Sequence, residues 1–260
     1  RLLKINLRPI LFKGVHQKFG GQLQLFISGG AAIDASVAKG FRELGINFIQ
    51  GYGMTEASPI ISVNRVEDCK DDSVGLPLPD VEVKLIDSEI VVRAPSVMKG
   101  YYLNELATSE VIKDGWLYTG DLGYFDEEGF LYVNGRKKSV IVTRGGKNVY
   151  PEEVESVLNQ SPYILESLVW GGPEEQASKV LIQAIIVPNI ETFDTDFGPE
   201  GYDETTIYNS ITAEVKKCSR ALANYKRVKR FVIRSEEFKK TTTRKIKRYL
   251  YTGRPQQVIG

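Results

Sequence analysis

The sequence has 260 residues, of which 42% are hydrophobic and 26% are charged, a balance that excludes disordered and collagen-like chains. Lys and Arg total 34 against 33 for Asp and Glu, so the net charge is +1, which argues against a strong general binder of nucleic acid or anionic membranes. Two cysteines and one histidine, His16, are too few for a disulfide framework or a zinc site, and no apolar run approaches the roughly 20 residues of a membrane span.

The first half of the chain alternates predicted strands with glycine-containing loops. Residues 23–28 alternate apolar and polar side chains before Gly29-Gly30, which predicts a strand that ends in a glycine turn. A helix is expected from Asp34, and residues 46–49 form a second buried strand that enters a turn at 51–53. This order is typical of α/β folds, which bind ligands at strand ends.

From Gly75 onward the alternation continues with Pro and Gly between the apolar runs, which favours an antiparallel sheet or barrel. The charged stretch Gly135–Ser139 is the predicted domain boundary. Beyond it we expect helices that begin at Pro151 and span residues 207–222, and strands at 139–143, 167–170, 180–187 and 228–233. The sequence therefore predicts part of a larger α/β domain followed by a compact α+β domain.

The segment Gly51-Tyr52-Gly53-Met54-Thr55-Glu56 is the first candidate site. Its glycines permit a sharp turn and close approach to a ligand, and Tyr52 offers a flat face for a base. Thr55 supplies a hydroxyl and Glu56 a hard oxygen ligand, a pair suited to phosphate and Mg²⁺. A tight turn whose polar residues only cap the next helix explains the segment equally well.

Three further segments carry polar groups of interest. Asp121 in Trp116–Asp121 can accept hydrogen bonds from two ribose hydroxyls, although a hairpin turn with a solvated Asp is the commoner explanation. Arg136 is suited to hydroxyls or phosphate, and Lys245 in the basic tail to the charge on a transferring phosphate, but both also fit a solvated surface.

Taken together, these segments resemble the adenylate-forming (AMP-binding) superfamily of acyl-CoA synthetases, adenylation domains and firefly-type luciferases. The matching segments, in chain order, are Ser28–Ala32, Gly51–Glu56, Gly75–Pro77, Trp116–Asp121, Gly135–Asn148 and the segment around Lys245. Within the superfamily, Val91–Tyr102 and Lys18–Leu23 are most similar to long-chain fatty acyl-CoA synthetases.

The resemblance implies an α/β and α+β architecture. Residues 1–134 would be the C-terminal part of the large nucleotide- and acyl-binding domain, with a sheet-and-helix portion and a small β-barrel portion. Residues 135–139 would be the hinge, and residues 140–260 the small C-terminal lid domain.

The resemblance also implies roles in nucleotide binding. Tyr52 and Gly53 would lie against adenine, and the wall beside adenine and the acyl group would be formed by Gly29, Gly30 and Ala31. Thr55 would bind phosphate and Glu56 would bind Mg²⁺. The ribose would be held by Asp121 and Arg136.

In the second domain the implied roles concern two half-reactions. Lys138 matches the hinge position, and Lys245 would reach the carboxylate and the α-phosphate while the acyl-adenylate forms. After rotation about the hinge, Gly145 and Gly146 would line the path of the CoA thiol, so one small domain would serve both steps.

The sequence departs from the family pattern in three ways, of which one, Ser88 in place of a common glycine ahead of Glu89, is expected to have only local consequences. The Ser/Thr/Gly-rich phosphate loop is absent, so we expect the chain as given to be inactive in ATP activation even if the longer protein is an enzyme. Arg244 stands where the family often has glycine before the lysine, which bears on how Lys245 approaches the site.

The function expected from the resemblance is that of an AMP-forming acid–thiol ligase acting on long-chain fatty acid, ATP and CoA, with Mg²⁺ as the metal. Other carboxylate-activating enzymes, such as an aryl-CoA ligase or an amino-acid adenylation domain, and a silent nucleotide-binding module are the alternatives. We expect small-molecule partners and no nucleic acid, and a cytoplasmic location with peripheral membrane contact open. The sequence leaves the oligomeric state undetermined.

Overall fold

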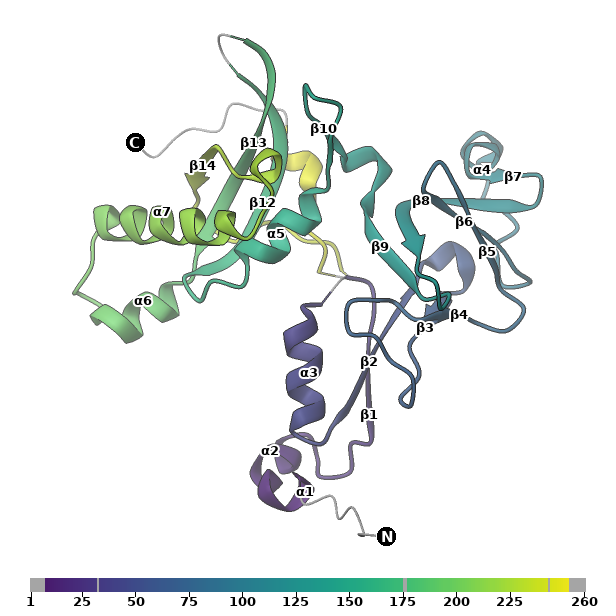
Figure 1. Ribbon diagram of the computed structural model, residues 1–260, viewed down its shortest axis with the longest axis horizontal. Coiled ribbons are helices and arrows are strands. Elements are labelled where there is room, and N and C mark those ends of the chain that lie inside the picture. The colour runs from purple at the N-terminus through teal and green to yellow at the C-terminus, as the bar shows by residue number, and fades with distance from the viewer. Residues whose placement is uncertain (1–7, 32, 175–176, 243, 253–260) are drawn as a thin grey trace. The chain divides into compact units, whose positions relative to one another are not determined.

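The structure is a computed structural model that describes residues 8–31, 33–174, 177–242 and 244–252, so Ala32 and Thr243 of the motifs above lie outside it. The chain forms two compact units, Arg1–Val133 and Asn134–Gly260 (Figure 1). Their boundary falls one residue before the end we predicted for the first domain. Each unit has its own core, and together they confirm the predicted mixture of α/β and antiparallel architecture.

The first unit begins with two short helices, α1 (Arg8–Leu11) and α2 (Lys13–Lys18). His16 of α2 places its Nε2 atom 2.8 Å from the carbonyl oxygen of Leu44, just after α3 (Ala35–Glu43). The single histidine of the chain therefore makes a structural contact.

Four strands form the first sheet of this unit, in the order β1 (Leu25–Ser28), β2 (Asn47–Gly53), β3 (Ile60–Val63) and β4 (Leu76–Pro77). β1 and β2 are parallel and are joined by α3, whereas β3 and β4 run antiparallel to their neighbours. The Asp34 side chain caps α3 by accepting a hydrogen bond from the Ser36 N–H at 2.7 Å, as expected from its position.

The glycines of the first candidate segment lie within β2, so the predicted turn at 51–53 is wrong. A Cβ atom on Gly51 would lie 3.1 Å from the Ser62 carbonyl oxygen, and one on Gly53 would collide with the Pro59 carbonyl oxygen. The register also shifts between Tyr52 and Gly53. Gly53 leaves no room for a side chain because the Pro59 backbone lies against it, whereas a side chain at Gly51 would press on the Ser62 carbonyl oxygen of β3.

The second sheet of the first unit has the strand order β5-β6-β8-β7, with β9 paired to β8. Its strands are β5 (Glu82–Ile86), β6 (Glu89–Arg93), β7 (Ile112–Lys113), β8 (Trp116–Phe125) and β9 (Leu131–Arg136). A short helix not predicted from the sequence, α4 (Glu105–Val111), precedes β7. Buried residues of this sheet, including Ile90 and Leu117, pack against Ala57 and Ile61 and form one core with the first sheet.

The second unit is built on a three-stranded sheet of β12 (Ile164–Glu174), β13 (Ala177–Pro188) and β14 (Arg230–Ile233). Its helices are α5 (Pro151–Leu158), α6 (Ile190–Phe197) and α7 (Glu204–Arg220). The strand predicted at 139–143 is shorter: β10 (Ile141–Val142) pairs with β11 (Asn148–Val149) in a small hairpin.

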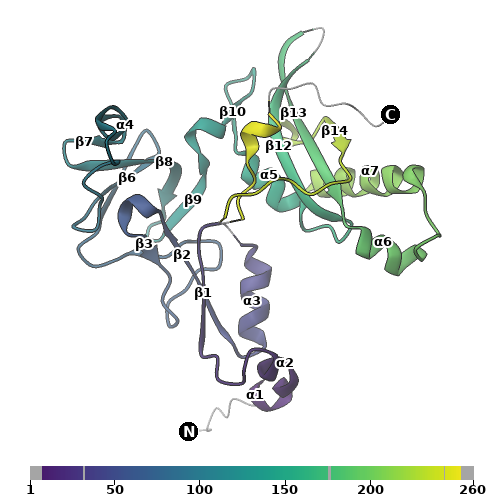
Figure 2. The same cartoon turned by 180° about the vertical axis from the view of Figure 1, so that it is seen from behind.

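Both faces of this sheet are covered. Along β13, Ile182, Ala184 and Ile186 join the core that contains α5 and α7, whereas Ile185 and Val187 join a second cluster on the opposite face. The second cluster contains Phe238 and Tyr251, so the C-terminal segment covers the face that the helices leave open (Figure 2). Two buried faces explain why the sequence of this strand reads as a continuous apolar run.

The C-terminal segment reverses direction between Lys240 and Ile246, which pair as an antiparallel bridge. The Arg244 N–H donates to the Thr241 carbonyl oxygen at 2.9 Å, and Arg244 has a φ of +61°. That left-handed conformation suits glycine, the residue that the resemblance to the adenylate-forming family leads us to expect at this position.

Replacing Gly53 with alanine should destabilise the first unit by at least about 2 kcal/mol, because the new methyl group displaces the backbone at Pro59. The urea midpoint of unfolding measures this change. Gly14→Ala in α2 is the matched control, since its Cβ would have no neighbour within 4 Å. Equal midpoints for the two variants would show that β2 and β3 tolerate a wider spacing.

Replacing Arg244 with glycine should raise the free energy of unfolding of the second unit by about 0.5–1 kcal/mol. Relief of the left-handed backbone exceeds the entropy that glycine adds to the unfolded chain. Lys247→Gly, at a residue with φ of −76°, should instead lower stability. A loss of stability in Arg244→Gly would contradict the strain argument.

Candidate functional site

The glycine loop after β1 lies beside the end of β2. Ser28 pairs with Gln50 in the parallel ladder, and a Cβ atom on Gly29 would lie 3.4 Å from the Gly51 carbonyl oxygen. Gly30 has a φ of +88°, so the chain turns away from the strand there, and Ala31 is exposed. Because β1 and β2 are parallel, their carboxyl ends meet, and residues 29–31 adjoin Gly51-Tyr52-Gly53.

A hydrogen bond joins the two most specific sequence motifs. The Tyr52 hydroxyl donates to the Asp121 carboxylate at 2.7 Å, although the two residues are 69 positions apart. Tyr52 belongs to β2 of the first sheet and Asp121 to β8 of the second. The structure therefore brings together the aromatic ring and the carboxylate that the sequence analysis had considered separately.

Asp121 stands on a bulge within β8, so the alternative of a hairpin turn at this position is wrong. Three residues between Tyr118 and Leu122 face the single residue Ile90 of β6, and Gly120 within them has a φ of +71°. Bulges of this kind redirect side chains and are common next to active sites. Asp121 is only 6% exposed.

Neighbouring polar groups satisfy the backbone of this bulge. The Gly120 N–H donates to the buried carboxylate of Glu89 at 3.1 Å, and the Asp121 N–H donates to the Thr119 hydroxyl at the same distance. The Thr119 hydroxyl in turn donates to the Ile90 carbonyl oxygen at 2.8 Å. These bonds fix the backbone that carries Asp121, and sequence reasoning did not single out Glu89 or Thr119.

Thr55 and Glu56 lie in the 3₁₀ helix η1 (Thr55–Ala57), which directly follows β2 and Met54. Thr55 is exposed, whereas Glu56 is half-buried. The Tyr101 hydroxyl donates to Glu56 Oε1 at 2.9 Å, and the Met98 N–H donates to the Glu56 carbonyl oxygen at 2.8 Å. The segment after β6 thus holds Glu56 by both its backbone and its side chain.

Tyr101 is a site residue that the sequence reasoning missed. Burial, together with the hydrogen bond to Glu56 and the charge of that carboxylate, raises the pKa of the Tyr101 phenol. The Tyr101 N–H donates to the Thr108 hydroxyl of α4 at 2.9 Å, which ties the backbone of Tyr101 to that helix. The contact between Tyr101 and Glu56 spans 45 residues, and no local pattern signals it.

Metal binding at this site would depend on few protein ligands. Within the described part of the chain, no group of three or more His, Cys, Asp and Glu side chains is arranged to hold a metal ion. Glu56 is a single carboxylate with the Thr55 hydroxyl next to it in sequence. Mg²⁺ commonly binds through one or two carboxylates and completes its shell with substrate phosphates and water, so these residues fit it.

The other predicted site residues belong to the second unit. Arg136 ends β9 and is exposed, and Gly145 and Gly146 are exposed in the loop between β10 and β11. Lys245 is exposed in the C-terminal turn, where the Thr241 N–H donates to its carbonyl oxygen at 2.8 Å.

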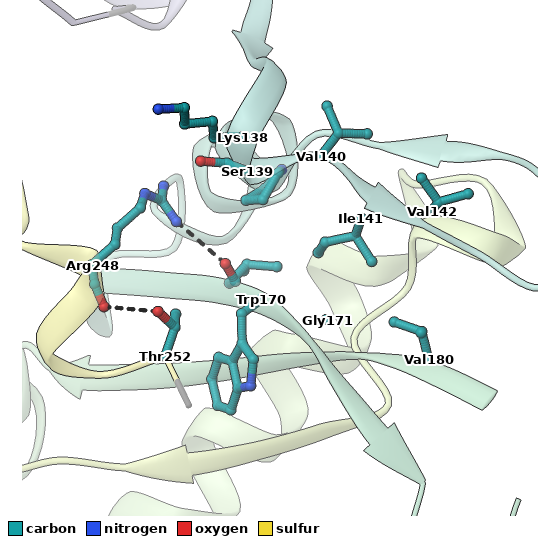
Figure 3. A pocket seen from close by; sticks show the side chains of 12 residues that line it. Lys138, Ser139, Val140, Ile141, Val142, Trp170, Gly171, Val180, Arg248 and Thr252 are labelled. Carbon is teal, nitrogen blue, oxygen red and sulfur yellow. Dashed lines mark hydrogen bonds between the residues drawn. The ribbon is translucent and has the colours of Figure 1, made fainter. Parts of the chain in front are cut away.

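Lys138 lies in the 3₁₀ helix η2 (Lys137–Ser139) at the edge of a cavity of about 370 Å³ (Figure 3). The wall of the cavity includes β10 residues, Trp170 and Arg248. The Arg248 guanidinium donates to the Val169 carbonyl oxygen at 3.3 Å, as drawn in Figure 3. The predicted hinge residue and the C-terminal segment therefore line the same cavity.

Helices that could cross a membrane do not occur among residues 8–31, 33–174, 177–242 and 244–252. The finding concerns these residues alone.

Comparison with known proteins relates the chain to one family. A sequence model described as AMP-binding enzyme matches residues 2–102. The long-chain-fatty-acid–CoA ligase FadD15 of Mycobacterium bovis is 34% identical over 256 residues, which cover 92% of this chain and 42% of that protein. The long-chain-fatty-acid–CoA ligase of Escherichia coli O157:H7 is 40% identical over 172 residues, covering 61% of this chain and 30% of that protein.

Solved structures give the same result. The o-succinylbenzoate CoA synthetase of Bacillus subtilis, in complex with its acyl-adenylate OSB-AMP, superposes with a TM-score of 0.74 at 29% identity, covering 95% of this chain and 51% of that one. The anthranilate CoA ligase AuaEII in complex with anthranoyl-AMP gives a TM-score of 0.73 at 28% identity, covering 88% of this chain and 44% of that one.

The chain thus spans about half, or less, of the length of the proteins it matches. The family model and the named relatives agree with the solved structures. The chain belongs to the family of AMP-binding, adenylate-forming enzymes.

Proposed function

We propose that the protein carrying this chain is an AMP-forming long-chain fatty acid–CoA ligase. A fatty carboxylate attacks the α-phosphorus of ATP to give acyl-AMP and pyrophosphate, and the CoA thiol then displaces AMP to give the thioester. The single observation that carries the proposal is the hydrogen bond between Tyr52 and Asp121, because it joins the aromatic and acidic groups that a nucleoside requires.

In the first unit, the proposed nucleotide site uses the ends of β1 and β2 and the bulge of β8. The Tyr52 ring offers a face for adenine, next to Gly53 and beside the loop of Gly29, Gly30 and Ala31. Asp121 accepts hydrogen bonds from ribose hydroxyls, since an ionised carboxylate has only acceptors. Its fixed backbone means that little ordering is needed when the nucleoside binds.

Thr55 and Glu56 are the proposed phosphate and Mg²⁺ residues. When bound, Mg²⁺ would neutralise charge on the phosphates, and Glu56 is the carboxylate that would hold it. The hydrogen bond from Tyr101 orients that carboxylate. An ATP complex with magnesium is known for the o-succinylbenzoate CoA synthetase of B. subtilis, which is 29% identical to this chain.

In the second unit, the proposed roles divide between two steps. The exposed Lys245 ammonium approaches the carboxylate and the α-phosphate in the first step, where it stabilises the developing charge. Arg136 assists with the ribose, and rotation about Lys138 then brings Gly145 and Gly146 to the CoA path. Closure thereby completes a different site for each half-reaction.

The substrate class rests on the curated relatives, which are named as long-chain fatty acid ligases at 34% and 40% identity. The solved neighbours favour a second candidate, an aryl-CoA ligase, because two of them act on o-succinylbenzoate and anthranilate. A silent nucleotide-binding module is the third alternative. The experiments below separate all three.

In the whole protein, ATP–pyrophosphate exchange should be supported by long-chain fatty acids and weakly by acetate or an aryl acid. Exchange requires reversible acyl-adenylate formation, so it reports the first step alone. A maximum with the aryl acid would establish the second candidate. An absence of exchange with every acid, in folded protein that binds ATP, would indicate the silent module.

Replacing Lys245 with alanine should lower the rate of acyl-adenylate formation by at least about 100-fold, because the site loses a charge that acts in the transition state. Thioester formation from preformed acyl-AMP should change by less than about twofold. Lys239→Ala, an exposed lysine of the same segment, is the matched control and should leave both rates unchanged. Equal losses in both half-reactions of Lys245→Ala would remove Lys245 from this role.

A further inference from the structure

The segment that presents Lys245 is a hairpin with two short legs, Phe238–Thr242 and Arg244–Arg248, called here the lysine hairpin. Its legs are joined by the bridge between Lys240 and Ile246 and by a hydrogen bond from the Lys247 N–H to the Lys239 carbonyl oxygen at 2.9 Å. Such a short pair of strands is marginally stable alone. Its geometry therefore depends on what it packs against.

The first leg is held by Glu166 of β12. Glu166 Oε1 accepts a hydrogen bond from the Phe238 N–H at 2.8 Å, and Oε2 lies 2.8 Å from the Lys240 ammonium. Glu166 is only 9% exposed. One buried carboxylate thus fixes both the backbone and a side chain of this leg.

The second leg is held by Glu155 of α5. Glu155 Oε2 accepts a hydrogen bond from the Arg248 guanidinium, and Oε1 accepts one from the Val169 N–H at 2.6 Å. Arg248 also donates to the Val169 carbonyl oxygen (Figure 3). Glu155 is 8% exposed, so this ion pair ties the end of the hairpin to both α5 and β12.

Apolar packing adds a third attachment. The Tyr251 ring meets the Phe238 ring edge-on with centroids 5.0 Å apart, and its hydroxyl accepts a hydrogen bond from the Lys239 N–H at 2.7 Å. Both rings pack on Leu168, Ile185 and Val187 of the sheet. This cluster supplies hydrophobic stabilisation that the two carboxylates do not.

Stability alone does not explain why two carboxylates are buried here. Removing an ion pair from water is costly, and apolar replacements are often neutral or stabilising. Burial raises the pKa of the Glu155 carboxyl against the opposing effect of Arg248. The pair of Glu155 and Arg248 fixes the orientation of the Arg248 side chain, because the guanidinium is planar and binds a carboxylate in a fixed geometry.

We propose that Glu155, with its partner Arg248, and Glu166 are positioning residues that hold the lysine hairpin so that Lys245 reaches the reacting phosphate. This inference rests on the proposed function, since it assigns these residues to the adenylate-forming step. They act through the hairpin and touch no substrate. A displacement of about 1 Å at a reacting group can lower a rate by about 100-fold, so such positioning has a measurable effect.

The test is the double variant Glu155→Leu/Arg248→Met in the whole protein, which removes both charges of the pair together. Glu152, whose Oε1 lies 3.5 Å from the Arg248 guanidinium, loses that contact and keeps its charge. Acyl-adenylate formation should fall by about 10- to 100-fold, while thioester formation from preformed acyl-AMP changes by less than about twofold. Lys217→Met removes the ion pair that the exposed Lys217 makes with Glu214 on α7 and should leave both rates unchanged.

A second measurement does not depend on activity. Amide hydrogen exchange of residues 239–242 and 244–248 should become at least about tenfold faster in the double variant, with exchange in α7 unchanged. The proposal would be overturned if amide exchange were unchanged. It would also be overturned if neither half-reaction became slower. Equal losses in both half-reactions with a lowered melting temperature would also overturn it, by showing a purely structural pair.

The proposed function itself can fail separately. If Lys245→Ala leaves adenylate formation intact, the role of the lysine is wrong, whatever the double variant does. If Lys245→Ala abolishes that step and the double variant does not affect it, only the positioning role is wrong. Glu166→Gln then tests the first leg alone, because the amide oxygen still accepts from Phe238 but no longer carries a charge for Lys240.

Discussion

The hydrogen bond between Tyr52 and Asp121 depends on the architecture of both sheets of the first unit. It connects β2 of one sheet with β8 of the other, and it requires a specific backbone at each end. On β2, glycines allow β3 to approach closely enough to define the path of the strand. On β8, the bulge turns Asp121 toward the tyrosine. Neither strand would present its side chain correctly if its backbone were regular.

Much of the fold was predictable because local patterns determine it. The start of α5 at Pro151 and the two-faced burial of β13 follow from proline placement and a continuous apolar run. Two of the errors, at Gly51–Gly53 and at Gly120, concern glycines. Glycine signals either a turn or a close backbone approach, and only the neighbouring strand, which is distant in sequence, distinguishes the two.

The candidate site was predictable to a different extent. Resemblance to the adenylate-forming family made Tyr52, Glu56, Asp121 and Lys245 candidates, but spacing alone does not show that any of them touch. Tyr101 and the pair of Glu155 with Arg248 were missed because their contacts span 45 and 93 residues. Long-range hydrogen bonds between side chains leave no periodic trace in a sequence, whereas buried faces of helices and strands do.

The proposed reaction explains why the lysine hairpin is fastened within its own unit. A lysine that serves one half-reaction and then withdraws cannot rely on contacts with the nucleotide site to set its position, because those contacts are lost at each turn of the cycle. The position of the lysine must therefore be fixed by contacts within the unit that moves. Glu155 and Glu166 provide this, since both belong to the second unit and hold the hairpin from its own sheet and helix. In the proposed reaction, a hairpin that is held rigidly within the second unit therefore keeps its geometry when that unit rotates as one body.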